Sequence, residues 1–297
     1  MLNYLKSYLT KSDIHFKEHE SIAAVCSVRI GSVADIIVYP KTQNDLLLTL
    51  KYLQNNRIQY LIQGRFTNSL FRDNRTSVPI ICTSHLCGLE PCGDGVICES
   101  GVSLPMLASV AVLHGLSGLE PLSGIPGSLG ASVVGNAGAF GREISDLVES
   151  VTVYDTVGGT TEIFSPRECG FAYRESALSP RYILLSCRLR LSISDRVSVR
   201  NESLRIKRLR RDSQPTDKPS LGSVFRRCEL GSAAALIDSA GLKGAKIGGC
   251  EISQKHAGFI INTGGGRAED YIGLMYLCRK SVFEKYGVLL TPEIKII

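Results

Sequence analysis

The sequence has no apolar run that approaches the roughly 18 residues a membrane-spanning helix needs. Its first residues, MLNYLKSYLTKSD, contain neither a continuous apolar stretch nor a small-residue cleavage site, so no signal peptide is predicted. Internal repeats and low-complexity tracts are also missing. We therefore expect a cytoplasmic, globular protein that does not bind a membrane.

Common cysteine motifs are missing too, although the chain has ten cysteines. Cys82, Cys87, Cys92 and Cys98 cluster around His85, but no C-x-x-C occurs and the spacing matches no common zinc or iron–sulfur pattern. A disulfide scaffold is not expected in a chain of this size without an export signal. We expect reduced thiols that serve as small core residues, and no metal site.

Two nucleotide-binding motifs are excluded, since the chain contains neither the G-x-G-x-x-G of a Rossmann turn nor a P-loop. A basic run, RNESLRIKRLRR at residues 200–211, contributes to the formal net charge of +6. It lacks the interleaved aromatic side chains of a nucleic-acid platform, so no nucleic-acid partner is expected. A solvated helix face and a site for a small anion such as a diphosphate both stay open.

What is present is ordinary for a globular protein: 297 residues, 44% hydrophobic and 21% charged, enough for two domains. In the first half, 34–40, 58–64 and the run VPIICTS are predicted strands, and 44–56 is a predicted helix with Asn44 as N-cap. Residues 102–115 predict a second helix, with Ser103 as cap, Pro105 in its first turn and Gly115 just past its end. Three predicted strands follow, in the runs LVESVTVYDT, TTEIFS and YILLSCRLRLSI.

Residues 194–211 predict the connection to a second unit. After the irregular segment 214–227, a short helix is expected between Ser232 and Gly241, then a strand and turn in HAGFIINTGGG. A long amphipathic helix is predicted over 267–287, ending at Gly287. The chain is therefore expected to be α+β.

The segment LSGIPGSLGASVVGNAGAFG, residues 122–141, contains six glycines. Because glycine costs backbone entropy, this density favours close approach of a flat or anionic ligand to the backbone over a tightly packed set of turns. The segment, with GLEP before it, resembles the flavin-contacting region of UDP-N-acetylenolpyruvoylglucosamine reductases. The resemblance continues through FAYRES (171–176), QPTDKPSLGSVFRR (214–227), AGLKGAKIGGCEISQKHAGFIINTG (240–264) and LLTPEIKII (289–297), and VRIGSVADIIVYPKT (28–42) is similar to the family's opening.

The resemblance implies a vanillyl-alcohol-oxidase/PCMH-type FAD-binding domain, residues 1–197, followed by a smaller α+β substrate-binding domain, residues 198–297. It implies that NADPH reduces FAD, and that the enolpyruvyl ether of UDP-N-acetylglucosamine then accepts the hydride and a proton to give UDP-N-acetylmuramate, a peptidoglycan precursor. The direct passage from YRES to the next strand is similar to the smaller, type-II members. The implied partner is a small UDP-sugar, and we expect a monomer.

The resemblance also assigns three catalytic residues. Arg174 matches the family's arginine that stabilises the developing carboxylate charge, Ser223 its proton donor, and Glu293 a residue that hydrogen-bonds the same carboxylate. For FAD, the matching or adjacent positions are Gly64, Thr67, Asn68, Gly124, Ile125, Pro126, Gly127, Asn136 and Gly138. For the uridine diphosphate of the substrate, the candidates are Tyr173, Arg210, Arg211 and Asn262.

One loop departs from the family pattern. In QGRFTNSLFRD (63–73), Arg65 and Phe66 stand where glycines are expected. If these positions need a positive φ, each side chain costs on the order of 1 kcal/mol or more. Arg65 either pairs with the pyrophosphate of FAD or blocks it. Two alternatives to an active reductase therefore remain: a non-catalytic relative that binds a UDP-sugar or a partner without FAD, and a flavin oxidase acting on another substrate.

Overall fold

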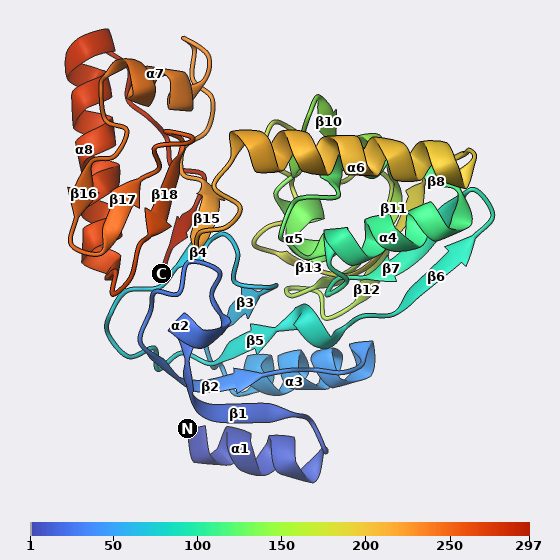
Figure 1. Ribbon diagram of the computed structural model, residues 1–297. Coiled ribbons are helices and arrows are strands. Elements are labelled where there is room, and N and C mark those ends of the chain that lie inside the picture. Colours follow the sequence, from blue (N-terminus) through green and yellow to red (C-terminus); the bar gives the residue numbers. More distant parts are fainter. Residues whose placement is uncertain (1) are drawn as a thin grey trace. The chain divides into compact units, whose positions relative to one another are not determined.

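Helices and strands both occur along the whole chain in the computed structural model, which describes residues 2–297 (Figure 1). The chain divides into two compact units. Unit 1 comprises Met1–Glu18, Ile36–Arg65 and Val78–Arg208, and unit 2 comprises His19–Asp35, Phe66–Ser77 and Leu209–Ile297. Two N-terminal segments belong to the unit that contains the C-terminal residues. The division into an FAD-binding domain, residues 1–197, and a substrate-binding domain, residues 198–297, stays a prediction.

Unit 1 contains the larger sheet, which is antiparallel with the strand order β12-β11-β13-β7-β6. Its strands are β6 (Leu89–Cys92), β7 (Gly95–Glu99), β11 (Val148–Asp155), β12 (Thr161–Phe164) and β13 (Tyr182–Arg190). A second sheet has the order β1-β2-β5-β3 and consists of β1 (Phe16–Ser21), β2 (Val33–Val38), β5 (Ile80–Cys82) and β3 (Leu61–Gln63). The division between the units runs within β1 and β2.

The helices and short elements of unit 1 connect these strands. They are α1 (Leu2–Lys11), α3 (Gln43–Asn55), η1 (Thr83–His85), α4 (Leu104–His114), β8 (Leu116–Ser117), η2 (Glu120–Leu122), α5 (Leu129–Val134), β9 (Gly138–Ala139), β10 (Arg142–Glu143), η3 (Ile144–Asp146) and β14 (Ser192–Ile193). Helix α4 has the predicted limits, with the Ser103 hydroxyl accepting from the Met106 N–H and Gly115 in the left-handed conformation. Helix α3 begins at Gln43 rather than at Asn44, because Thr42 and Asp45 form a capping box.

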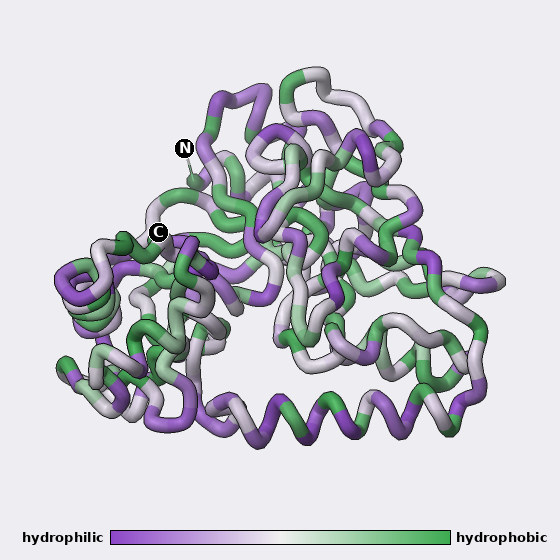
Figure 2. The backbone as a smooth tube through the Cα atoms, turned by 90° about the horizontal axis from the view of Figure 1, so that it is seen from above, coloured by the Kyte–Doolittle hydropathy of each residue, from purple (hydrophilic) through white to green (hydrophobic). Residues whose placement is uncertain are grey.

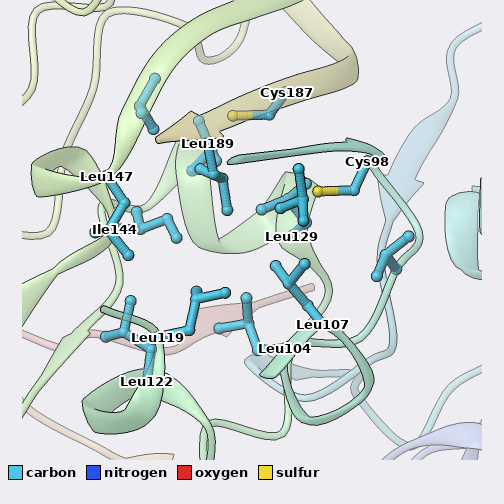
Figure 3. Close-up of a cluster of buried hydrophobic side chains, with 14 of the residues drawn as sticks. Cys98, Leu104, Leu107, Leu119, Leu122, Leu129, Ile144, Leu147, Cys187 and Leu189 are labelled. Atoms are coloured by element: carbon cyan, nitrogen blue, oxygen red, sulfur yellow. The ribbon is translucent and has the colours of Figure 1, made fainter. Parts of the chain in front are cut away.

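Two hydrophobic cores lie on the two faces of the larger sheet. Neighbouring side chains of β13 point to opposite faces, so that Leu184 joins one core and Leu185 the other. The first core contains α4, α5 and the strand cysteines Cys98 and Cys187 (Figure 3). The second contains residues of α1, α3, β2 and β5. The cysteines are free thiols, mostly buried, which agrees with their predicted use as core residues.

Unit 2 is built on a four-stranded antiparallel sheet with the order β15-β18-β17-β16. Its elements are α2 (Ile22–Val25), β4 (Ser69–Leu70), β15 (Ser220–Ser223), α7 (Ala233–Ser239), β16 (Lys246–Ile247), β17 (Cys250–Ile252), β18 (Phe259–Asn262), α8 (Ala268–Tyr286) and β19 (Lys295–Ile296). Helix α8 ends as predicted at Gly287, which has a φ of 70°. Strand β19 pairs in parallel with β4, which joins the C-terminal residues to an N-terminal segment.

The basic run forms helix α6 (Arg196–Ser213), within which the division between the units also falls. Its buried residues, Val199, Ser203 and Ile206, recur at helical spacing on one face. Figure 2 shows the resulting alternation of hydrophilic and hydrophobic residues along this long helix. The basic side chains of Arg196, Arg200 and Lys207 are exposed, as in a solvated helix face. None of the helices in residues 2–297 combines the length and apolar character that crossing a membrane requires.

Candidate active site

The glycine-rich segment of unit 1 runs beside the segment that follows β7. The N–H of Gly130 donates to the carbonyl of Ser100 at 2.8 Å, and the N–H of Leu104 donates to the carbonyl of Gly127 at 3.1 Å. A Cβ on Gly130 would lie 2.8 Å from the Cβ of Ser100. A Cβ on Gly138 would lie 2.9 Å from the carbonyl oxygen of Arg142. At both positions, glycine is required by close approach of the protein's own chain.

Two buried hydroxyl groups lie at this crossing. The Oγ atoms of Ser100 and Ser128 have no hydrogen-bond partner within residues 2–297, although these residues are only 2% and 0% exposed. A Cβ on Gly64 would lie 2.3 Å from the Ser128 Oγ, so the loop after β3 passes directly against this hydroxyl. An unpaired buried hydroxyl costs about 1–3 kcal/mol, which makes this crossing a favourable place for a polar ligand group.

The loop after β3 contains the two residues that replace expected glycines. Phe66 has a φ of 53°, the left-handed region that disfavours large side chains, whereas Arg65 does not have a positive φ. The expectation of backbone strain is therefore confirmed at Phe66 and wrong at Arg65. Phe66 is 3% exposed and its ring lies 5.8 Å from that of Phe71 in unit 2.

Replacing Phe66 by glycine is expected to destabilise the protein although it removes the strain. Relief of the left-handed φ gains about 1–2 kcal/mol, whereas loss of a buried phenylalanine costs about 3–5 kcal/mol. We expect the free energy of unfolding of Phe66→Gly to fall by about 2 kcal/mol, measured by urea denaturation. Phe66→Ala, which keeps the strain, is the matched control and should be about 1 kcal/mol less stable still. A Phe66→Gly variant more stable than the wild type would contradict this.

Arg174 lies in a tight turn that is fixed to the glycine-rich segment. The N–H groups of Ala172 and Glu175 each donate to the other residue's carbonyl, at 3.0 and 3.1 Å. Within unit 1, the Arg174 guanidinium donates to the carbonyls of Asn136 at 3.2 Å and Gly138 at 2.7 Å. Its Nη1 also lies 3.6 Å from Oε1 of Glu143. Arg174 itself has a φ of 58°, and such strained backbone is concentrated at functional sites.

The buried side chain of Asn136 holds this turn in place through hydrogen bonds. Its side chain is 1% exposed and donates to Oε2 of Glu143 at 2.7 Å and to the carbonyl of Ala172 at 2.9 Å. Its Oδ1 accepts from the N–H of Ser145 at 3.2 Å. The amide that the sequence assigns to FAD is thus used to hold the turn that presents Arg174. Tyr173, beside it, is 43% exposed, with its ring centroid 5.0 Å from the Arg174 guanidinium carbon.

Unit 2 brings three of the predicted residues together through its backbone. Ser223 is exposed at the end of β15, directly after Gly222, whose φ is 80°. The N–H of Glu293 donates to the carbonyl of Val224 at 2.8 Å, so Glu293 lies one residue from Ser223 across this pairing. The side-chain amide of Asn68 donates to the carbonyl of Glu293 at 3.2 Å. Asn68, Ser223 and Glu293 therefore form one local group.

The other predicted substrate residues of unit 2 have separate environments. Asn262 is 7% exposed, and its amide donates to the carbonyls of Val28 and Arg29 and accepts from two main-chain N–H groups. Its observed use is to fix these loops. Arg210 is partly buried, and burial lowers its pKa. The next residue, Arg211, has a side chain that is 71% exposed and lies 3.7 Å from the Asp212 carboxylate. The assignment of these three residues to a substrate stays a prediction.

Comparison with known proteins places both units in one family. Residues 34–164 match the model of an FAD binding domain, and residues 214–297 match that of the UDP-N-acetylenolpyruvoylglucosamine reductase C-terminal domain. The UDP-N-acetylenolpyruvoylglucosamine reductase of Caldanaerobacter subterraneus is 37% identical over 100% of this chain and 98% of its own. The chain belongs to the UDP-N-acetylenolpyruvoylglucosamine reductase family. The protein of the same name from Caldicellulosiruptor bescii is 39% identical over 98% of this chain and 93% of its own.

The solved structures agree with membership of the reductase family. UDP-N-acetylenolpyruvylglucosamine reductase from Thermus caldophilus matches with a TM-score of 0.80 and 29% identity, covering 95% of this chain and 98% of that one. A BBE-like protein of Physcomitrella patens shares the fold, with a TM-score of 0.50 at 13% identity over 63% of this chain and 44% of its own. The predicted α+β fold with a PCMH-type FAD-binding domain is therefore confirmed.

The residues of unit 1 fit the FAD of a reductase-family protein. The stretch that matches the FAD-binding model contains the two unpartnered hydroxyls, Ser100 and Ser128, and the closely packed Gly64 and Gly130. Unpartnered hydroxyl groups suit the phosphate and hydroxyl oxygens of a dinucleotide. This crossing is therefore the candidate place for FAD in unit 1.

Sequence reasoning missed Ser100, Ser128 and Glu143. A serine within an ordinary strand–turn pattern carries no signal that its hydroxyl is buried and unpartnered. Glu143, which contacts both Asn136 and Arg174, belongs to a strand of only two residues. Within residues 2–297, no group of three or more His, Cys, Asp or Glu side chains could hold a metal ion.

Proposed function

We propose that this protein catalyses the NADPH-dependent reduction of UDP-N-acetylglucosamine enolpyruvate to UDP-N-acetylmuramate, a step in the synthesis of peptidoglycan precursors. Membership of the reductase family over the full chain supports the proposal. The observation that carries it is Arg174, a strained arginine fixed to the glycine-rich segment of the FAD-binding unit. We further propose that the protein acts in the cytoplasm, as a monomer.

Arg174 is proposed to bind the carboxylate of the enolpyruvyl group. When bound, FAD supplies the chemistry of hydride transfer, between NADPH and the terminal carbon of the enolpyruvyl double bond. Addition of hydride leaves an electron pair on the neighbouring carbon, which is delocalised into the carboxylate. A guanidinium held in advance by the Asn136 and Gly138 carbonyls stabilises this added charge without reorganisation.

Ser223 is proposed to donate the proton that completes the reaction. A hydroxyl is a weak acid, so it serves only because the carbon that it protonates is strongly basic. Its position after Gly222 leaves it exposed on unit 2. Glu293, one residue away across the backbone pairing, is proposed to hydrogen-bond the same carboxylate in its protonated form.

Tyr173, Arg210, Arg211 and Asn262 are proposed to support binding of the UDP moiety, and Thr67 and Asn68, together with residues 124–127, binding of FAD. The formal net charge of +6 favours the approach of an anionic nucleotide sugar and an anionic nicotinamide cofactor.

The visible absorption spectrum of the purified protein tests the proposal. We expect a flavin band that is released on denaturation, is bleached by NADPH and returns when the enolpyruvyl nucleotide is added under anaerobic conditions. Production of UDP-N-acetylmuramate is followed in parallel by mass spectrometry. A protein that neither carries nor takes up FAD would be a non-catalytic relative. A protein whose flavin is bleached by NADPH but not reoxidised by the enolpyruvyl nucleotide would act on another substrate.

A further inference from the structure

Arg65 has an unusual set of partners for a half-buried cation. In unit 1 its guanidinium donates to the carbonyl of Gly101, through Nε at 3.3 Å and Nη2 at 3.0 Å. Nη2 also lies 3.5 Å from the carbonyl oxygen of Ser84 and 3.9 Å from Sγ of Cys87. Within residues 2–297, none of these hydrogen-bond partners is a carboxylate. The protein groups that bind the Arg65 guanidinium are therefore neutral.

Arg65 belongs to a group of basic residues around His85. Burial lowers the pKa of the neighbouring His85, and the charges of Lys17, Lys41, His15 and Arg65 lower it further. These residues all belong to unit 1. A half-buried cation among other cations is stabilised when an anion binds to it, because burial without a counter-charge is unfavourable.

The two unpartnered hydroxyls, those of Ser100 and Ser128, belong to segments that contact Arg65 or the residue before it. Ser128 Oγ is packed against Gly64, which precedes Arg65 in the chain. Ser100, the other unpartnered hydroxyl, precedes Gly101, whose carbonyl binds the guanidinium. A guanidinium and two hydroxyl groups thus belong to neighbouring segments of unit 1, and such donors match an anion with several oxygen atoms.

We propose that Arg65 is the charged partner of the FAD diphosphate and determines how tightly this chain retains FAD. A glycine at this position could offer the cofactor only its main-chain N–H, whereas Arg65 adds a positive charge and a planar set of donors. The proposal deepens the proposed function, since it concerns the FAD of the same site, but it does not depend on the identity of the substrate.

FAD binding to the apoprotein tests the proposal through three variants. Arg65→Gln keeps a donor for the Gly101 carbonyl and removes the charge, Arg65→Lys keeps the charge, and Lys51→Ala removes an exposed positive charge from α3 as the matched control. Dissociation constants are measured by quenching of flavin fluorescence at about 0.05 and about 0.5 M salt. Thermal unfolding of each apoprotein confirms that the variants are folded.

We expect Arg65→Gln to weaken FAD binding by about 10- to 100-fold at low salt, the range of a charge-assisted hydrogen bond. Its affinity should also depend less on salt than that of the wild type. Arg65→Lys should keep the salt dependence while binding FAD more weakly than the wild type, and Lys51→Ala should match the wild type.

An Arg65→Gln variant that binds FAD as tightly as the wild type, with the same salt dependence, would overturn the proposal. Tighter binding would also overturn it and would show that Arg65 obstructs the cofactor. If Arg65→Gln does not fold, Arg65→Lys decides alone, because loss of the salt dependence in that variant would contradict a role for charge. A wild-type protein that shows the expected dependence on Arg65 but does not reduce the enolpyruvyl nucleotide would overturn only the proposed function.

Discussion

Replacing Ser223 by alanine is expected to lower kcat for the enolpyruvyl substrate by about 10²- to 10⁴-fold, the usual contribution of a positioned acid. Reduction of the bound flavin by NADPH should be unchanged, because that step requires no proton from Ser223. The fold should also be unchanged, since Ser223 is exposed and joins its sheet through the backbone opposite Phe259. Stopped-flow measurement of flavin bleaching and of its reoxidation by substrate separates the two steps.

The controls for this variant come from the same strand. Ser223→Cys retains a group that can donate a proton and should recover part of the lost rate. Ser220→Ala removes another hydroxyl of β15 and should leave both steps as in the wild type. If Ser223→Ala reoxidised at the wild-type rate, the proton would come from another group, and the nearby Glu293 would be the next to replace.

Replacing Arg174 by lysine is expected to lower kcat by about 10²- to 10³-fold, the effect of losing one donor that stabilises a developing charge. Lysine keeps the charge but lacks the planar guanidinium, which donates to the carbonyls of Asn136 and Gly138. A lysine could not keep both of these hydrogen bonds and also bind the carboxylate of the proposed substrate. Because the interaction strengthens as the charge develops, kcat should fall more than the substrate affinity. Steady-state kinetics with substrate binding measured by calorimetry gives both quantities.

A nearby arginine provides the control for Arg174. The side chain of Arg142 is 43% exposed and lies 4.0 Å from Asp146, so Arg142→Ala removes a positive charge close to the glycine-rich segment. It should leave kcat within about two-fold, because an exposed ion pair contributes little. If both arginine variants lost activity equally, the field of the segment rather than a contact of Arg174 would be responsible.

The sequence best predicts helices whose first and last residues are set by a neighbouring capping residue or glycine. Ser103 and Gly115 set the limits of α4, and Gly287 ends α8, because a cap or a left-handed residue acts within one turn of its own helix. For α3, the sequence predicts Asn44 as the N-cap, but the structure has Thr42 there. Thr42 and Asp45 together satisfy two main-chain N–H groups, whereas a single asparagine cap satisfies one.

Features that depend on distant partners could not be predicted in the same way. Strands β4 and β19 have two residues each, too few to show a period, so their pairing could not be predicted. Nor could the place of residues 66–77 in unit 2. The resemblance predicts roles for Arg174, Ser223 and Glu293 from their motifs. It could not reveal that Asn136 holds the turn of Arg174, because that contact requires the main chain at Ala172.

The pairing of β4 with β19 also has a consequence for how the protein folds. Asn68 and Glu293, joined by a hydrogen bond, are separated by 225 residues. Closing so long a loop is slow, and the second partner becomes available only after the residues between them have been synthesised. During translation, residues 66–77 therefore remain without their strand partner, and we expect this segment to be among the last to become protected from hydrogen exchange.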